Sequence, residues 1–251
     1  MASLAGSYDM KEKNPTSVYN PSNSTHSLLV FSKTTGFRHE SIEAGIEALK
    51  KLGPRHELSL KFTESSGYVG SDSLFTHDAI LFLNTTGTLF TDKERSYLKR
   101  FIQAGGGFVG VHSAADTEYD WPWYEGLVGA YFDNHPNNPN VREAAIMVSD
   151  EDHPALNGLP QRWEREDEWY NYRSFKESLQ ILLKLDTDSY EGSDHPGNHP
   201  IAWYREYDGG RSFYTGLGHT EESYSDPLFL NHLMGGILYA LGADGPVGNN
   251  P

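Results

Sequence analysis

The chain has 251 residues, of which 37% are hydrophobic and 13% aromatic, a composition typical of one folded globular domain. Acidic residues outnumber basic ones by 35 to 20, and the resulting formal charge of −15 disfavours a nucleic-acid partner. The chain has no cysteine, which excludes disulfides, thiolate metal sites and a cysteine nucleophile.

The N-terminal segment, residues 1–26, is polar and lacks the basic start and apolar core of a signal peptide. We therefore expect this segment to be a disordered arm and, since no signal peptide is recognised, the protein to be cytoplasmic. Elsewhere no apolar run approaches the roughly 20 residues that cross a bilayer, so we expect no membrane association.

The first half of the domain alternates apolar runs with amphipathic segments. Strands are predicted at 27–33, 56–62, 77–84 and 107–112, the second of them from its alternating pattern. Helices are predicted at 37–53 and 91–107, the second opening with Thr91 and Glu94 in capping-box positions. This β-α-β-(connection)-β-α-β order predicts an α/β fold with a parallel, doubly wound sheet.

The second half is richer in strands. It predicts strands at 142–149 and 179–186, and a hairpin at 201–218 that turns at Asp208-Gly209-Gly210. An amphipathic helix at 226–242 has Pro227 near its first turn, and residues 243–251 form a loose tail. Because there is no internal repeat and no obvious linker, residues 27–242 are expected to form a single domain with a mixed sheet.

The stretch "GGGFVGVHSAADT" (105–117) predicts a strand that ends in a sharp turn with His112 at its tip. Such an elbow needs small residues two positions before and after the tip, which Gly110 and Ala114 supply; a tip at Ser113 would place Val111 there instead. A histidine can act as an acid or base or bind a metal, but does not replace a cysteine or serine in acyl transfer. We expect His112 to line a polar surface pocket; the alternative is that it only packs or caps the turn.

Three further histidines follow predicted strands or lie in adjacent loops: His39, His135 and His219. Ligands of open α/β sheets bind at the carboxyl ends of the strands, so His39 and His112 should share that edge, where His135 and His219 are candidates to join them. Nearby carboxylates are Asp116, Glu118, Asp167 and Glu168. Together such residues suit Zn²⁺ or Mn²⁺, although no HExxH-like spacing occurs and a hydrogen-bonded loop histidine is the alternative for each.

The segment "REDEWYNY" (165–172) combines acids with aromatic side chains, a pattern typical of sugar binding, in which rings stack on the apolar sugar face. One of its paired acids, Asp167 or Glu168, is a candidate general acid or base; a solvated acidic turn with a packed Trp169 is the alternative. "NTTGTLF" (84–90) offers hydroxyl and backbone contacts to a ligand. Neither a Walker loop nor a GxGxxG pattern is present, so no nucleotide cofactor is expected.

Several ordered motifs between about Leu28 and Gly242 together resemble the ThuA-like, or trehalose-utilisation, family: "FRHES", "NTTG", "GGGFVGVHSAADT", "WYEGLVGAYFDNHP", "DHPALNGLP", "DEWYNY" and "HPIAWYREYDGGRSFYTGLGHTEESY". The resemblance implies a flavodoxin-like three-layer sandwich similar to class I glutamine amidotransferase domains, with His112 in place of their cysteine. It also implies carbohydrate metabolism, especially of trehalose or 3-keto-sugars. The site it implies consists of Arg38, His39, Thr86, His112, Asp116, His135, Asp167, Glu168, Tyr170 and His219.

Two functions remain open from the sequence. In the first, an enzyme acts on a sugar or keto-glycoside: His112 is the general acid or base with Asp167 or Glu168 as partner, and Arg38 and His39 bind the oxygen that becomes charged. A divalent metal held by His39, His135 and His219 would favour isomerase or lyase chemistry, and hydrolysis is a variant. The remaining substrate-binding candidates are Thr86, Asp116, Trp169 and Tyr170.

In the second, the chain is a non-catalytic sugar-binding or regulatory protein that keeps the pocket. The titratable residues favour the enzyme, while Val111 disfavours a hydrolase that uses Ser113. The partner expected in both cases is a small carbohydrate, and the aromatic residues of "WPWY" (121–124) are compatible with a homodimer.

Overall fold

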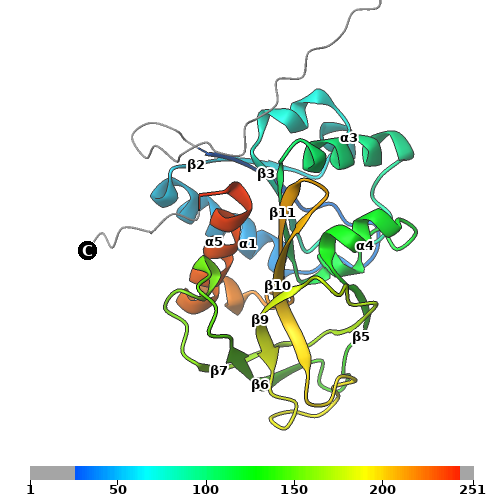
Figure 1. Ribbon diagram of the computed structural model, residues 1–251. Helices are drawn as coiled ribbons and strands as arrows, with labels where there is room; N and C mark the ends of the chain where they lie inside the picture. Colours follow the sequence, from blue (N-terminus) through cyan, green and yellow to red (C-terminus); the bar gives the residue numbers. More distant parts are fainter. Residues whose placement is uncertain (1–25, 244–251) are drawn as a thin grey trace, which may run out of the picture.

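The computed structural model describes residues 26–243 (Figure 1). The expected N-terminal arm and C-terminal tail lie outside the described residues, apart from one residue of each. His26, assigned above to the arm, is instead the first residue of a strand. Ala243, assigned to the tail, is buried, and its N–H donates to the carbonyl of Leu238 at 2.9 Å.

The strands are β1 (His26–Phe31), β2 (Leu58–Thr63), β3 (Ala79–Leu83), β4 (Gly107–Val111), β5 (Tyr131–Asn134), β6 (Val141–Val148), β7 (Arg162–Glu168), β8 (Asn171–Arg173), β9 (Gln180–Leu185), β10 (His199–Tyr207) and β11 (Gly210–Thr215). The α-helices are α1 (Ser41–Leu52), α2 (Ser66–Val69), α3 (Asp92–Gln103), α4 (Pro122–Val128) and α5 (Pro227–Leu241). Single 3₁₀ turns are η1 (Gly53–His56), η2 (Asp72–Thr76), η3 (His112–Asp116), η4 (Pro154–Leu156) and η5 (Glu222–Ser225).

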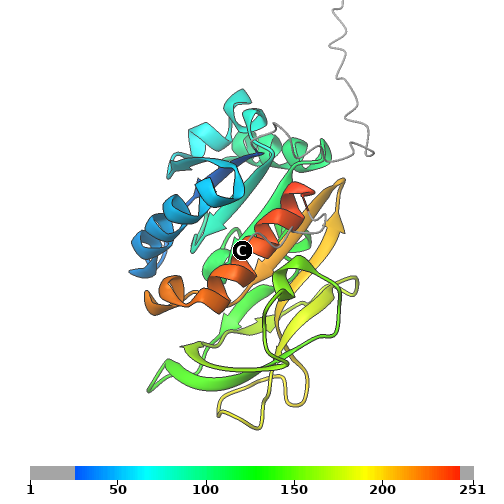
Figure 2. The same cartoon turned by 90° about the vertical axis from the view of Figure 1, so that its left-hand side faces the viewer.

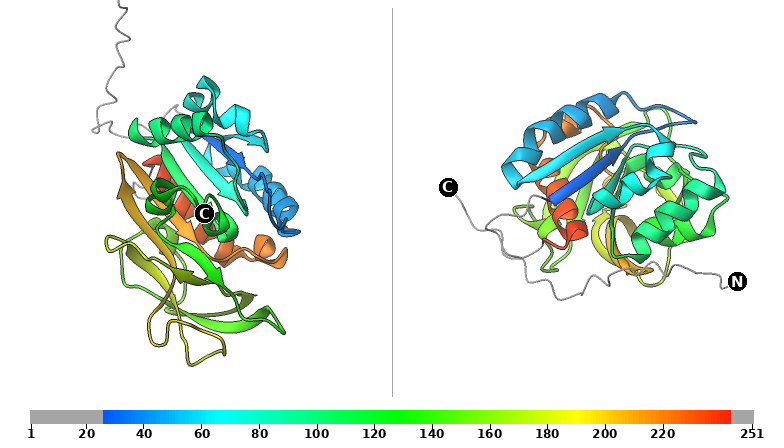
Figure 3. Two further views of the ribbon diagram at one scale, coloured as in Figure 1. Left: turned by 90° about the vertical axis from the view of Figure 1, so that its right-hand side faces the viewer. Right: turned by 90° about the horizontal axis from the view of Figure 1, so that it is seen from above.

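The main sheet has nine strands in the order β2-β1-β3-β4-β11-β10-β9-β6-β7. The first five are parallel, in the flavodoxin-like arrangement, and the rest alternate in direction. Helices α1 and α5 cover one face (Figure 2), and α3 and α4 cover the other (Figure 3). This confirms the predicted three-layer α/β fold with a mostly parallel sheet and an antiparallel hairpin.

Local sequence explains the elements that the prediction found. All five residues of β3 are buried, as expected of a central parallel strand. The capping box of α3 forms as predicted, with Thr91 accepting from the N–H of Glu94 and the Glu94 carboxylate accepting from that of Thr91. Helix α5 begins after Asp226, whose side chain accepts from the N–H of Leu228, and is followed by Gly242 with φ of +70°. Within residues 26–243, no helix combines the length and apolar character needed to cross a membrane.

Strand β7 was not predicted, because its sequence "RWEREDE" carries charges on both faces. Trp163, Arg165 and Asp167 alternate along one face, and the last two bind each other at 3.1 Å. A period-two pattern is therefore present, but two of its three inward residues are charged rather than apolar. Residues 165–168 are the end of a strand and not the acidic turn that we weighed as the alternative.

The direction of β7 brings its last residue to the site. Strands β10, β9, β6 and β7 are each antiparallel to the preceding one, so β7 runs in the same direction as β11 and the parallel strands. The carboxyl ends of β1, β4, β11 and β7 therefore share one edge of the sheet.

Candidate functional site

The turn after β4 has the geometry of a sharp elbow. His112 follows the strand directly and has φ of +47°, a left-handed conformation that costs a non-glycine residue about 1–3 kcal/mol. A Cβ on Gly110 would lie 3.0 Å from Cδ2 of Tyr214 and 3.3 Å from Cβ of Ala114, so the turn requires a small residue there. Strain of this kind persists where the surrounding structure holds it, often at functional sites.

The side chain of His112 is fully buried, and does not line a surface pocket as the sequence suggested. Its Nδ1 atom lies 2.9 Å from the carbonyl oxygen of Gly216, which can only accept, so Nδ1 carries a hydrogen and Nε2 is the nitrogen that faces the other polar side chains. The Tyr214 hydroxyl donates to the carbonyl of His112 at 2.7 Å. The ring of Tyr170 packs with its centroid 4.1 Å from that of His112. These contacts fix the direction of Nε2.

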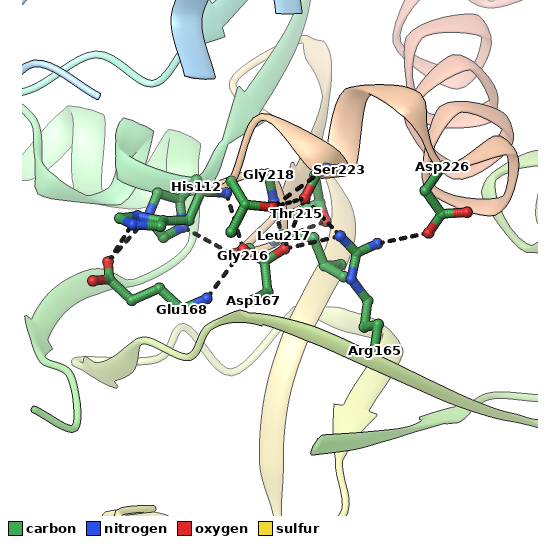
Figure 4. A network of polar contacts seen from close by, with 12 residues as sticks. His112, Arg165, Asp167, Glu168, Thr215, Gly216, Leu217, Gly218, Ser223 and Asp226 are labelled. Carbon is green, nitrogen blue, oxygen red and sulfur yellow. Dashed lines mark hydrogen bonds and ion pairs between the residues drawn. The ribbon is translucent and has the colours of Figure 1, made fainter. Parts of the chain in front are cut away.

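Two further polar side chains meet Nε2 of His112. It lies 3.1 Å from Nδ1 of His219 and 3.3 Å from Oε2 of Glu168 (Figure 4), and those two atoms are 3.1 Å apart. The ring of His39 has its centroid 5.0 Å from those of both other histidines. One ligating atom from each of the four residues lies within 4.8 Å of the others. We call this set, His39, His112, Glu168 and His219, the histidine–glutamate cluster.

The topology of the sheet explains why these four residues meet. His39 follows β1, His112 follows β4, His219 follows β11, and Glu168 is the last residue of β7. All four strands end at the same edge, so side chains from distant parts of the sequence converge there.

The cluster has the donors and spacing of a divalent metal site. Imidazole nitrogens and a carboxylate are common ligands of Zn²⁺, and ligands about 2.0–2.2 Å from a tetrahedral ion lie roughly 3.3–3.6 Å apart. The 3.1–3.3 Å separations among His112, His219 and Glu168 are close to that range. Outer hydrogen bonds orient two of the rings: His112 donates to the carbonyl described above, and Nδ1 of His39 lies 3.3 Å from Oγ of Ser113.

Two members of the cluster, His39 and Glu168, are held in the protonation states that bind a metal. Burial lowers the pKa of His39 to about 2, and the neighbouring His112 and His219 act in the same direction. Burial acts to raise the pKa of Glu168, but hydrogen bonds from the same two histidines outweigh it and hold the pKa well below its usual range. At neutral pH, His39 is neutral and Glu168 is ionised.

Asp167 is fully buried and holds the loop that carries His219 (Figure 4). Its carboxylate accepts from the N–H groups of Gly218 at 2.9 Å and His219 at 3.1 Å. The same carboxylate forms an ion pair with Arg165 at 3.1 Å and accepts a hydrogen bond from the hydroxyl of Ser223 at 3.3 Å. These partners give Asp167 a positioning role, because they take up the oxygens that would otherwise face the cluster.

His135 lies at the outer side of Glu168. Its Nε2 is 3.6 Å from Oε1 of Glu168, and its side chain is 27% exposed. The Nδ1 atom is 3.0 Å from the carbonyl of Pro136. Asn140, which the sequence did not single out, donates to the same Glu168 oxygen at 2.8 Å. His135 is thus next to the histidine–glutamate cluster without being one of its four members.

Arg38 and Thr86 make contacts of the loop between β1 and α1, which also carries His39. The Arg38 side chain is exposed and its guanidinium pairs with Glu43 and Glu64, each at 2.9 Å. Thr86 is buried, and its hydroxyl donates to the carbonyl of Phe37 at 2.8 Å. The structure therefore puts both residues near the site but gives their polar groups partners within the protein.

Asp116 and Glu118 belong to the segment after the elbow. Oδ1 of Asp116 accepts from the Tyr119 hydroxyl at 2.6 Å, and burial raises the pKa of Asp116 against that hydrogen bond. Glu118 is fully buried and pairs with Arg95 at 2.6 Å. Glu118 is therefore part of a buried ion pair between this segment and α3.

The aromatic residues of 165–172 do not offer an open face to a sugar. Trp169, Tyr170 and Tyr172 are all buried, and Nε1 of Trp169 donates to the carbonyl of Arg142 at 2.9 Å. Of the three, only Tyr170 packs on a member of the histidine–glutamate cluster, because its ring lies against that of His112.

The sequence model of the family described as trehalose utilisation (ThuA) matches residues 27–240. None of the curated protein sequences matches the chain.

Solved structures share the fold. A ThuA-like protein from Bacteroides uniformis is 24% identical with a TM-score of 0.74, over 90% of this chain and 97% of that one. A ThuA-like protein from Parabacteroides merdae is 19% identical with a TM-score of 0.73, over 89% and 92%. A β-galactosidase from Bacillus circulans is 14% identical with a TM-score of 0.57, over 91% of this chain but 33% of the enzyme, a likeness that shows the fold alone.

Proposed function

The chain belongs to the ThuA family, and from that premise we propose that it is a metal-dependent enzyme acting on a sugar or keto-glycoside. The observation that carries this proposal is the convergence of three imidazoles and one carboxylate at the carboxyl edge of the sheet. The family description, trehalose utilisation, supports a carbohydrate as substrate. Location in the cytoplasm and a homodimeric state remain predictions.

Four residues would hold the ion: His39, His112, Glu168 and His219. A bound Zn²⁺ or Mn²⁺ would polarise a substrate carbonyl and so favour loss of a proton from the adjacent carbon. In this proposal His112 is a ligand rather than the general base, because Nδ1 donates to a backbone carbonyl and Nε2 faces the cluster.

In this proposal His135 is the base that accepts the proton. Its Nδ1 faces the carbonyl of Pro136, so the neutral ring has its lone pair on Nε2. When Nε2 accepts the substrate proton, the imidazolium is stabilised by Oε1 of Glu168 at 3.6 Å. Return of that proton to a different carbon gives an isomerase, and loss of a leaving group from the neighbouring carbon gives a lyase.

Deuterium exchange tests this function directly. The purified protein, loaded with Zn²⁺ or Mn²⁺, is incubated with a methyl 3-keto-glucopyranoside in D₂O and followed by proton NMR. We expect the signal of the proton next to the carbonyl to disappear with the wild-type protein. His135→Gln should retain the metal and lose the exchange. Metal-loaded wild-type protein without exchange or product would contradict the proposal.

The alternative is a non-catalytic sugar-binding protein. It is favoured by burial, since His39 and His112 are nearly or fully covered and the cluster has little open surface. The same NMR experiment separates the two, because a binding protein would broaden the sugar resonances while every proton remained in place.

A further inference from the structure

A single exposed aromatic ring stands beside the histidine–glutamate cluster. Phe37 is 66% exposed, more than any other large hydrophobic residue in the described part of the chain. Isolated exposed hydrophobics are normal on protein surfaces, so exposure alone means little. The position of Phe37 is what distinguishes it from Met147 or Phe75, the next most exposed.

Phe37 packs directly on a cluster residue. Its ring centroid lies 4.9 Å from that of His39, at an interplanar angle of 87°. Because His39 is buried and Phe37 is exposed, the phenyl ring lies on the solvent side of the imidazole. A molecule that approached the cluster from this side would meet Phe37 first.

The loop that carries Phe37 is held rather than loosely attached. The carbonyl of Phe37 accepts from the Thr86 hydroxyl at 2.8 Å, and the N–H of Thr35 donates to the carbonyl of Thr86 at 2.9 Å. On the other side, Arg38 is tied to two surface carboxylates. These contacts hold the backbone that carries the ring before any ligand binds, which lowers the conformational cost of binding.

We propose that Phe37 is the residue that selects the substrate of this site, by stacking on the apolar C–H face of a pyranose ring whose oxygens face the histidines. This inference rests on the proposed function, which supplies the polar side of the same ligand. It also reassigns the stacking role expected of residues 165–172, whose aromatic rings are buried. The pyranose chair presents a patch of C–H groups on one face that fits such an arrangement, whereas an open-chain polyol has no fixed apolar face.

Binding measured by calorimetry and saturation-transfer NMR tests the role without requiring turnover. The probes are trehalose and methyl α-D-glucopyranoside, with sorbitol as the open-chain control. We expect Phe37→Ala to weaken pyranoside binding by about tenfold, or about 1.4 kcal/mol, and Phe37→Trp to retain it. Phe75→Ala is the matched control. Phe75 lies in η2, before β3 and so at the opposite edge of the sheet, where its ring packs on Tyr97 and Phe101 of α3.

The outcomes separate this inference from the proposed function. Unchanged pyranoside affinity in Phe37→Ala would overturn it, and so would an equal loss of affinity for sorbitol. Absence of pyranoside binding to the wild-type protein would also overturn it. So would a change of oligomeric state in Phe37→Ala in place of the affinity loss. Elemental analysis of the same samples should show equal metal in wild type and Phe37→Ala. Pyranoside binding through Phe37 by a protein that holds no metal would contradict the proposed function and leave the role of Phe37 standing.

Discussion

Nε2 of His112 lies 3.3 Å from Oε2 of Glu168, although β11, β10, β9 and β6 separate their strands in the sheet. Five strand spacings in a flat sheet would amount to roughly 24 Å. The antiparallel half of the sheet therefore curls back toward the elbow, and Asp167 fixes it there through the 216–219 loop. The site depends on this closure, since without it the three histidines would have no carboxylate partner.

Glu168→Gln should weaken metal binding with little change in shape. The substitution removes the negative charge but keeps the size of the side chain, so we expect metal affinity to fall at least tenfold to a hundredfold. Glu164→Gln, on the exposed face of the same strand, is the matched control and should bind as wild type. Calorimetry with Zn²⁺ and Mn²⁺ measures both. Equal affinity in the two variants would show that Glu168 is not a ligand.

Asp167→Asn should act mainly on stability. The change removes the carboxylate charge 3.1 Å from the buried guanidinium of Arg165, which keeps Asp226 at 3.4 Å. The loss should therefore be smaller than the roughly 3–5 kcal/mol that a buried charge left without any partner costs. Chemical denaturation of the metal-free variant measures this loss of unfolding free energy. Unchanged stability combined with complete loss of activity would instead mean that Asp167 takes part in the chemistry.

Ser113→Ala separates a supporting hydroxyl from a nucleophile. The Ser113 hydroxyl is buried and 3.3 Å from Nδ1 of His39, so its loss should weaken metal binding by roughly tenfold at most. Activity should return at saturating metal concentration. Activity that stayed absent at every metal concentration would support the serine hydrolase that the sequence disfavoured.

Acid should destabilise the metal-free protein through His39. In the unfolded chain this histidine takes up a proton below about pH 6.5, whereas the fold lowers its pKa to about 2, chiefly through burial. Stability is therefore present above pH 6.5 and is lost as pH falls toward the folded value. Between pH 7 and 5, His39→Gln should lose less unfolding free energy than wild type by on the order of 1–2 kcal/mol. Parallel pH profiles of the two proteins would contradict this assignment.

Glu168 contributes with the same sign in a lower range. Its pKa is depressed in the fold, so its contribution is present above the unfolded value of 4.5 and disappears as pH falls below it. The acid limb of the stability profile should therefore continue below pH 4.5 in the metal-free His39→Gln variant, and denaturation curves at pH 3–5 measure it.

The parts of the fold that follow local rules could be predicted from the sequence. Strands β1, β3 and β4 are apolar runs, α3 begins with a capping box, and the hairpin has its turn glycines. Since parallel strands share their carboxyl edge, this order also brought His39 and His112 together.

What the sequence concealed was long-range and ionic. The inward face of β7 pairs Arg165 with Asp167, so no hydrophobic pattern marked it as a strand. Which of two adjacent acids faces the histidines depends on the loop hydrogen bonds that Asp167 accepts. Trp169 and Phe37 show the same limit for aromatic residues, because burial in the tertiary structure decides which one is core and which one is exposed.

Metal analysis of the purified protein tests the central claim most directly. Wild type and His112→Ala are stripped with a chelator, reloaded with Zn²⁺ or Mn²⁺, dialysed and measured by elemental analysis and thermal unfolding. The histidine–glutamate cluster predicts one bound ion in wild type, a higher unfolding temperature on reloading, and neither in His112→Ala. Wild-type protein that takes up no ion, or His112→Ala that takes up the same ion equally well, would contradict the metal site.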